Sequence, residues 1–457
     1  MRPERKLILV VIDGLTPAAF ERAVESGDAP ALAFLAEHGE YARAVSTFPS
    51  LTPVCLASIA TGTHPDGHHI PHLAWYHRGE QRIVEYGSSY AAMRAVGRRR
   101  VMRDAVLTMN QEHLARDRPT IFEQLERAGL ETAAVNFTCY RAGNRHRSTV
   151  PGVPPAYGPR RFFYFNLFES DRTGAPLAVR SRVVGSVDAY ASMVGRWLVT
   201  RDGFDFFVYY LPDYDFASHH YGPEGTAGAL ARSDAAVGAL LEAAGGGDEF
   251  LDRYAVILCS DHGQTPVRRG VRLERSLASF RLAPPRGPTN GAELAVTASN
   301  RVGMVYRLPG CRADTRELAL RLEEEPALDV VLFREGEEVI VRREGAELRL
   351  ARDEDDWRAT GDARLLPEPD AFERVWAALA NPNVGDLVVT AAEGVELADI
   401  GGRHHAGGGS HGSLCRGDSE VPMVTIGTGP PPRRIVDVAP LAASHFGVAA
   451  ATPARAA

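Results

Sequence analysis

The stretch KLILVVIDG (residues 6–14) decides the fold of this chain. Its apolar run shows no polar alternation, which is typical of a strand buried on both faces of a parallel sheet. The same shape returns in FDFFVYYLPDYD (204–215) and in RYAVILCSDHG (253–263), each time with a carboxylate where the strand ends. We therefore expect a mostly parallel sheet whose strand ends share one edge, where such sheets bind their ligands.

Amphipathic stretches separate these apolar runs, and this alternation indicates an α/β fold. The pattern changes between residues 296 and 380, where we expect a strand, a helix and three short antiparallel strands. This segment is predicted to be an inserted α+β subdomain, so the catalytic domain would comprise residues 1–295 and 381–457. Within its second part, DLVVTA (386–391) is expected to return to the main sheet. Residues 140–180 show no clear periodicity and are interpreted as a long functional loop.

The composition excludes several classes of protein. Hydrophobic residues make up 45% of the chain and charged residues 24%, as in an ordinary globular protein. A formal net charge of -7 argues against nucleic acid as a bulk electrostatic partner. Lys6 is the only lysine, which excludes phosphate loops that depend on a lysine. One local basic cluster is interpreted as a solvated face, and it comprises Arg98, Arg99, Arg100 and Arg103.

The cysteines and the apolar runs bear on the compartment. The five cysteines lie far apart and form no CxxC pair, so we expect neither a disulfide framework nor a thiolate metal site. The N-terminal apolar run, residues 7–12, is too short for a signal peptide and ends in Asp-Gly. No segment approaches the roughly 18–20 apolar residues that a membrane span needs. We therefore expect a cytoplasmic protein without a membrane span.

A second informative stretch is VSTFPSLTPVCLASIATGTHPDGH, residues 45–68. Threonine is a preferred N-cap and proline is preferred at the first helical position, so Thr52 and Pro53 predict a helix over roughly 53–61. The N-terminus of a helix is a favourable place for an anion. Most Thr-Pro pairs are only caps, however, so a further role for Thr52 depends on the rest of the chain.

Four other segments place metal-type ligands at strand ends or in loops. Each has a bland alternative, because such residues also serve as helix caps, surface contacts or turn residues. All four fall at the same expected edge of the sheet, and carboxylates mixed with imidazoles suit zinc or a similar first-row metal. Two such ions can hold the attacking and leaving oxygens of a phosphoryl transfer and can activate a threonine hydroxyl. The candidate ligands are Asp13, the i,i+4 pair Asp215 and His219, the adjacent pair Asp261 and His262, and His411.

The order of these motifs resembles that of the alkaline phosphatase superfamily, and most closely its type I phosphodiesterase/nucleotide pyrophosphatase branch. The motifs are VIDG (11–14), FPSLTP (48–53), ATG (60–62), HPDGHHI (64–70), DFASHHYGP (215–223), SDHG (260–263) and GSHGS (409–413). The resemblance implies an alkaline-phosphatase-like three-layer sandwich with a mostly parallel central sheet. It also implies a nucleophile nine residues before Thr61, which is Thr52 rather than Thr47 or Ser50.

The resemblance further implies two divalent metal ions, zinc or alternatively manganese. One ion would be held by Asp13, Asp261, His262 and the Thr52 oxygen. The other would be held by Asp215, His219 and His411. Two nearby residues, Asp213 and His220, fall outside the motif register and are not expected to be ligands.

The sequence departs from this family at one place. The asparagine that contacts a phosphoryl oxygen in nucleotide pyrophosphatases is replaced by Leu73, so the corresponding contact must come from elsewhere or be weaker. A histidine cluster close by is expected to form a polar lid beside the site rather than an extra metal site; it comprises His64, His68, His69 and His72.

The sequence therefore predicts a phosphodiesterase that forms a phosphothreonine at Thr52 and acts on a small-molecule phosphate ester. Phosphomonoesterase, phosphonate hydrolase and sulfatase activities on the same core remain open. A non-catalytic metal-binding or ligand-binding protein is the alternative of another class. The physiological substrate, the substrate-binding residues and the oligomeric state do not follow from the sequence.

Overall fold

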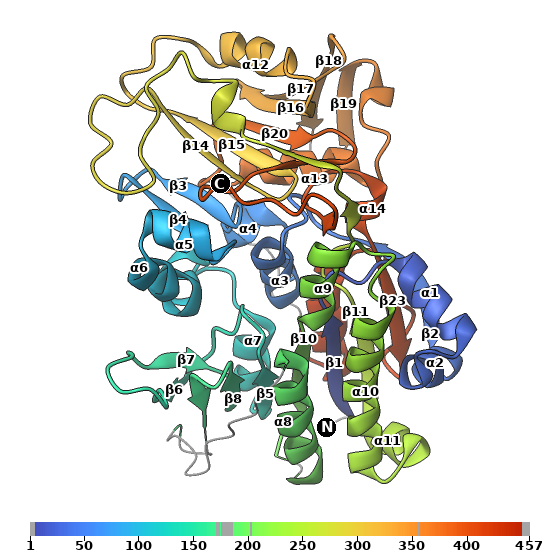
Figure 1. Ribbon diagram of the computed structural model, residues 1–457. Helices are drawn as coiled ribbons and strands as arrows, with labels where there is room; N and C mark the ends of the chain where they lie inside the picture. Colours follow the sequence, from blue (N-terminus) through green and yellow to red (C-terminus); the bar gives the residue numbers. More distant parts are fainter. Residues whose placement is uncertain (1–4, 171–173, 175–185, 202, 354–355, 450–457) are drawn as a thin grey trace.

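The computed structural model describes residues 5–170, 174, 186–201, 203–353 and 356–449, and its centre is an eight-stranded sheet (Figure 1). Strand β1 (Lys6–Ile12) lies between β10 (Phe206–Leu211) and β11 (Tyr254–Cys259), and all three run parallel. The sheet continues in parallel through β5 (Thr132–Val135) and β8 (Arg161–Tyr164). The edges are antiparallel and consist of β23 (Glu420–Ile426), β2 (Glu40–Val45) and β9 (Phe168–Glu169).

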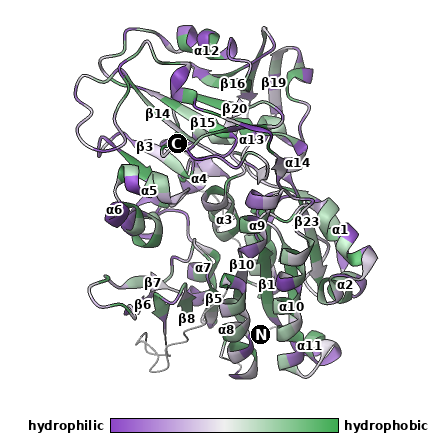
Figure 2. Cartoon of the chain, in the orientation of Figure 1, coloured by the Kyte–Doolittle hydropathy of each residue, from purple (hydrophilic) through white to green (hydrophobic). Residues whose placement is uncertain are grey.

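Helices cover both faces of this sheet, because alternate residues of β1 enter two different cores. Ile8 and Val10 pack in one core with helices α1, α2, α8 and α10, whereas Leu7 and Leu9 pack in the other with α3, α7 and α15. The expected three-layer architecture is thus confirmed, and Figure 2 shows hydrophobic strands at its centre. The helices are α1 (Pro17–Ser26), α2 (Pro30–Glu37), α8 (Val187–Arg201), α10 (Ala227–Ala244), α3 (Thr52–Thr61), α7 (Ile121–Arg127) and α15 (Val438–His445).

A second, seven-stranded sheet lies beyond the carboxyl ends of the central strands, at the top of Figure 1. Helices α12 (Thr315–Glu323) and α13 (Ala371–Ala380) pack against it. Its strands are all antiparallel, in the order β14 (Leu294–Ser299), β15 (Val302–Arg307), β20 (Leu387–Ala391), β16 (Leu328–Glu335), β17 (Glu338–Arg343), β18 (Ala346–Asp353) and β19 (Asp356–Gly361).

Two details of the inserted segment differ from the prediction. The strand at 386–391 does not return to the main sheet, because β20 pairs with β15 and β16 in the second sheet. A short apolar run predicts a buried strand but carries no information about which sheet it joins. Four strands rather than three follow α12 before α13. The domain boundaries at 295/296 and 380/381 stay a prediction.

Two segments outside the repeating strand–helix pattern contain regular structure. A hairpin of β3 (Ala74–His77) and β4 (Arg82–Glu85) is followed by α5 (Tyr90–Val96), α6 (Arg98–Arg103) and the π-helix η1 (Asp104–His113). The segment 140–180 is not a single loop, because β8 and β9 join the main sheet and β6 (Asn144–His146) pairs with β7 (Ala156–Gly158). Residues 171–173 and 175–180 of that segment lie outside the described residues.

Within the described ranges, no helix combines the length and the apolar character needed to cross a membrane. The four arginines around α6 are exposed, as expected for a solvated face, and this helix is hydrophilic in Figure 2.

Candidate active site

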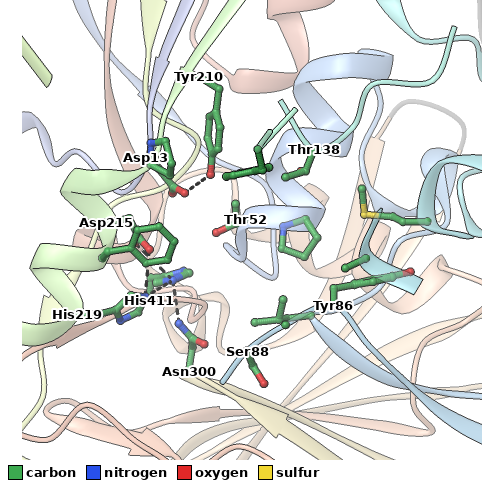
Figure 3. A pocket seen from close by; sticks show the side chains of 18 of the residues that line it. Asp13, Thr52, Tyr86, Ser88, Thr138, Tyr210, Asp215, His219, Asn300 and His411 are labelled. Atoms are coloured by element: carbon green, nitrogen blue, oxygen red, sulfur yellow. Dashed lines mark hydrogen bonds and ion pairs between the residues drawn. The ribbon is translucent and has the colours of Figure 1, made fainter. Parts of the chain in front are cut away.

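All seven candidate residues converge at the carboxyl edge of the central sheet. Asp13 follows β1, α9 (Asp213–Tyr221) follows β10, and Asp261 and His262 follow β11. His411 follows β22 (Gly409–Ser410), which pairs with β12 (Thr265–Pro266). A pocket of about 370 Å³ opens here, and five of the candidates line it (Figure 3): Asp13, Thr52, Asp215, His219 and His411.

Thr52 is the first residue of α3 and does not cap it, which corrects the expectation from the sequence. The N-cap is Leu51, whose backbone carbonyl accepts the amide protons of Val54 and Cys55. The Thr52 hydroxyl is therefore free of a capping role, and its Oγ1 lies 3.1 Å from His262 Nε2. The helix end still directs partial positive charge toward this side of the pocket.

One ligand group surrounds His262. Asp13 Oδ1 lies 3.3 Å and Asp261 Oδ2 lies 3.5 Å from His262 Nε2. Both carboxylate oxygens are buried and accept no hydrogen bond within the described structure. Burial, together with the charges of Asp261 and Asp215, raises the pKa of Asp13 well above its usual value. Buried, unsatisfied carboxylate oxygens facing an imidazole fit a divalent cation in this position.

A second ligand group lies beside the first. Asp215 Oδ2 is 3.3 Å from His219 Nε2, as the i,i+4 spacing predicts, and Asp215 Oδ1 is 3.9 Å from His411 Nε2. Burial alone would raise the pKa of Asp215, but the imidazoles of His219, His411 and His262 together outweigh it and hold that pKa below its usual value. Burial opposes the charge of His219 in turn, yet Asp215 raises the pKa of His219 to about 9. The His262 and His411 rings stack at 3.6 Å, so the two groups are continuous.

The three histidines share one orientation. In each ring Nδ1 lies within hydrogen-bond distance of a backbone carbonyl: 3.0 Å from Gly263 for His262, 2.9 Å from Gly409 for His219 and 2.7 Å from Ser50 for His411. A carbonyl only accepts, so Nδ1 carries the proton and, in the neutral ring, Nε2 keeps a lone pair. In the neutral rings all three Nε2 atoms thus point a lone pair toward the carboxylates, and at His219 a metal ion would displace the proton that Asp215 holds on the ring.

Three residues of the site were not found from the sequence. The Tyr210 hydroxyl donates to Asp13 Oδ2 and the Gln264 amide donates to Asp215 Oδ1, so each fixes one carboxylate. Asn300 lies in the β14–β15 turn with a left-handed φ of 58°, and its Nδ2 is 2.8 Å from His411 Nε2. Asparagine tolerates this backbone conformation, so Ser-Asn between two apolar runs did signal a turn. Nothing in the sequence placed that turn in the site.

The prediction that the histidine cluster forms a polar lid beside the site is wrong. His68 and His72 are fully buried, and their Nδ1 atoms accept the amide protons of Ile70 and Ala74. His72 Nε2 donates to the Val302 carbonyl, and His68 Nε2 pairs with Ser58. These rings replace missing backbone partners in a turn, and none of the four histidines of this cluster lines the pocket, whereas Leu73 does.

Asp213 and His220, which were not expected to be ligands, lie outside both ligand groups. The Asp213 carboxylate accepts the amide protons of Val187 and Asp188 and so caps helix α8. His220 is exposed and lines the pocket, but it belongs to neither ligand group.

Solved structures with the same fold span nearly the whole chain. The phosphonoacetate hydrolase of Sinorhizobium meliloti 1021, in complex with phosphonoformate, superposes with a TM-score of 0.62 at 19% identity and covers 97% of this chain and 96% of its own. Murine ectonucleotide pyrophosphatase/phosphodiesterase 5 gives a TM-score of 0.61 at 14% identity, covering 98% and 96%. The human protein of the same name gives 0.59 at 14% identity with the same coverage.

No curated protein matches the chain in sequence. The family model described as type I phosphodiesterase/nucleotide pyrophosphatase, in contrast, matches residues 7–414. This range contains every candidate residue of the site, from Asp13 to His411. The chain therefore belongs to the type I phosphodiesterase/nucleotide pyrophosphatase family of phosphoester hydrolases.

Proposed function

We propose that this protein is a two-metal phosphodiesterase that uses Thr52 as its nucleophile. The observation that carries this proposal is the shared orientation of His219, His262 and His411, whose Nε2 atoms face the buried carboxylates beside the Thr52 hydroxyl. One divalent ion would be held by Asp13, Asp261, His262 and Thr52, and the other by Asp215, His219 and His411. Zinc fits this mixture of ligands, with manganese as the alternative.

The chain's own residues account for the course of the reaction. Thr52 Oγ1 attacks phosphorus, a P–O bond forms, the bond to the leaving alcohol oxygen breaks, and the proton of the Thr52 hydroxyl ends on the released alcohol. Water then attacks the phosphothreonine, which releases the phosphate monoester and restores the hydroxyl. When bound, the ions lower the pKa of the hydroxyl and neutralise charge on the phosphoryl oxygens. Tyr210 and Gln264 keep Asp13 and Asp215 in place through their hydrogen bonds.

The wall of the pocket favours a diester over a monoester or a phosphonocarboxylate. Among the lining residues that the structure describes, none is a lysine or an arginine. A monoester dianion or a second carboxylate would gain from such a partner, whereas the second ester group of a diester needs an apolar surface. Such a surface is present and comprises Leu73, Tyr86, Met109, Tyr164, Phe165 and Phe216.

A substrate panel on the metal-loaded protein tests the proposal. We expect bis-p-nitrophenyl phosphate to be hydrolysed with a higher kcat/KM than p-nitrophenyl phosphate, an aryl sulfate or phosphonoacetate. A preference for the monoester, the sulfate or the phosphonate would overturn the diesterase assignment. A stable protein that binds no metal and turns over none of the four would favour the non-catalytic alternative.

Asn300 is expected to supply the phosphoryl contact that Leu73 cannot make. Its amide reaches the His411 side of the pocket. Loss of one such donor lowers the rate by about 10²- to 10³-fold in other hydrolases, so we expect a fall of about 10²-fold in kcat/KM for Asn300→Gly. Glycine suits the left-handed φ of 58°, so the backbone is preserved. Asn300→Asp keeps the shape of the side chain but lacks its amide donor, and it should lower kcat/KM by as much. A normal kcat/KM in both variants would show that the contact lies elsewhere.

Removal of the metal ions is expected to destabilise the protein, and more so at pH 8 than at pH 5. In the metal-free protein, burial and neighbouring carboxylates raise the pKa of Asp13 above that of the unfolded chain. The folded state then binds more protons, so its stability falls as pH rises above about 4. The ions replace those protons. At 100 times its dissociation constant each ion contributes about 2.7 kcal/mol, or about 3 °C in Tm for a chain of this size. Calorimetry with and without a chelator measures both differences, and an unchanged Tm at either pH would contradict the metal assignment.

A further inference from the structure

A second cluster of metal-type ligands lies outside the catalytic pocket, between the β3–β4 hairpin and the end of η1. Figure 1 labels the two strands of this hairpin. His77 ends β3, Glu80 lies in the hairpin turn, and His113 ends η1. Each offers one ligand atom, and these atoms lie within 4.8 Å of one another. The fold thus brings His77 and Glu80 close to His113, which is distant in sequence. Two imidazoles and one carboxylate are the ligand set of three-residue zinc sites.

The second observation is an unpartnered atom in His113. This side chain is 6% exposed, and its Nε2 is buried without a hydrogen-bond partner among the described residues. Its Nδ1 is held 2.8 Å from the Tyr86 hydroxyl, and the ring packs edge-on against Trp75. Burial, aided by the charge of Arg82, lowers the pKa of His113 to about 4, so the ring is neutral at physiological pH. A neutral, oriented imidazole with one unused nitrogen suits a metal ion.

Glu80 supplies negative charge that its neighbours do not cancel. Its Oε2 accepts a hydrogen bond from Arg82 Nε at 2.5 Å, and its Oε1 lies 3.7 Å from His77 Nε2. Arg82 also pairs with the buried carboxylate of Asp104 at 2.5 Å. The two carboxylates exceed the single guanidinium by one charge, which leaves an anionic site for a cation.

His77 is the adaptable member of the cluster. Its Nδ1 accepts the Glu80 amide proton at 3.0 Å, so in the present arrangement Nε2 carries the ring proton. Ligation through Nε2 moves the proton to Nδ1 and releases the Glu80 amide. The Glu80 side chain is 40% exposed at the hairpin turn, so water can take over that hydrogen bond.

We propose that His77, Glu80 and His113 bind a third divalent ion of the zinc class, separate from the catalytic centre. This ion would fix the β3–β4 hairpin to η1. The segment that it ties together forms one wall of the catalytic pocket, through Tyr86, Ala105 and Met109. Because Tyr86 is hydrogen-bonded to His113, the occupant of this site also holds that wall in position.

Metal counting tests the proposal on the full chain. The wild type and the variants Glu80→Gln and His77→Ala are equilibrated with zinc and freed of unbound metal. The number of zinc ions per chain is then measured by inductively coupled plasma mass spectrometry. We expect each variant to hold one ion per chain fewer than the wild type, and Glu80→Gln keeps the shape of its side chain. His38→Ala, which removes an exposed histidine from the end of α2, should hold as many ions as the wild type.

Two results would overturn the proposal. One is an equal count in the wild type, Glu80→Gln and His77→Ala. The other is a loss in His38→Ala as large as in the two cluster variants, which would indicate adventitious binding to surface histidines. The comparison is a difference between variants, so it holds whatever number of ions the catalytic centre binds. A matching readout is the rise in Tm on adding zinc, which should be smaller in both cluster variants.

Discussion

The Thr52→Ala protein is expected to fold, to retain its metal ions and to lose at least about 10³-fold in kcat for a diester substrate. The variant lacks the oxygen that would form the bond to phosphorus, and water has no equally placed site from which to attack. Alanine is a good helix former and removes no cap, since Leu51 occupies the N-cap position of α3. The comparison is made with steady-state kinetics and with metal content on the same preparation.

Two matched variants sharpen this result. Thr47 and Ser50 lie in the same stretch, but the Thr47 hydroxyl is 2.9 Å from His64 Nδ1 and the Ser50 hydroxyl donates to the Ser413 carbonyl. Thr47→Ala should therefore keep its turnover to within about tenfold. Thr52→Ser keeps a hydroxyl and should retain far more activity than Thr52→Ala. Wild-type turnover in Thr52→Ala, or an equal loss in Thr47→Ala, would refute Thr52 as the nucleophile.

A direct readout is available because the proposed reaction leaves the phosphoryl group, with its remaining ester, on the protein. Mixing with an excess of diester and stopping with acid should yield a Thr52 peptide whose mass is increased by the phosphoryl group and that ester. The Thr52→Ala protein should yield none under the same conditions.

The catalytic edge was predictable because its residues follow strands that are recognisable one at a time. Asp13 and Asp261 each end a continuous apolar run, and the i,i+4 spacing of Asp215 and His219 places both on one helical face. Parallel strands share an edge, so local patterns were sufficient to bring distant residues together. The Nδ1 partners of His219 and His411 could not be predicted, because they are backbone carbonyls of other loops.

Two features could not be predicted from the sequence: which sheet a strand joins, and how the second sheet packs on the first. The apolar run of β20 has the hydrophobic pattern of a buried strand, and that pattern does not depend on whether the strand joins the main sheet or the second one. Asn300 enters the pocket from the second sheet, so its position depends on how that sheet docks. His68 and His72 resembled a polar cluster because the sequence does not show that backbone amides need them as acceptors.

One buried ion pair joins the second sheet to the catalytic edge and leads to the second large prediction. Arg301, next to Asn300 in the β14–β15 turn, is 2% exposed and Asp418 is fully buried. Arg301 Nη1 lies 3.1 Å from both Asp418 oxygens, and Nη2 reaches the Ala392 carbonyl at 3.2 Å. Asp418 Oδ2 also accepts the Ser413 amide and hydroxyl protons, at 3.0 Å and 2.6 Å.

Arg301→Met and Asp418→Ala are each expected to lower the free energy of unfolding by about 3–5 kcal/mol, because each leaves the other charge buried and unpaired. The double variant should cost less than the sum of the two, since it leaves no lone charge. The exposed pair Arg364 and Asp362 is the matched control, and breaking it should leave the free energy of unfolding nearly unchanged. Urea denaturation measures all four changes.

The same pair should also couple stability to activity. The Arg301 amide donates to the His411 carbonyl at 2.8 Å, so the turn that carries Asn300 is attached to the loop of a proposed metal ligand. Arg301→Met is therefore expected to reduce kcat/KM at temperatures where it remains folded, whereas the Arg364 control does not. Additive costs in the double variant would show that Arg301 and Asp418 do not stabilise one another. A destabilised Arg301→Met protein with full activity would show that the pair does not position the active site.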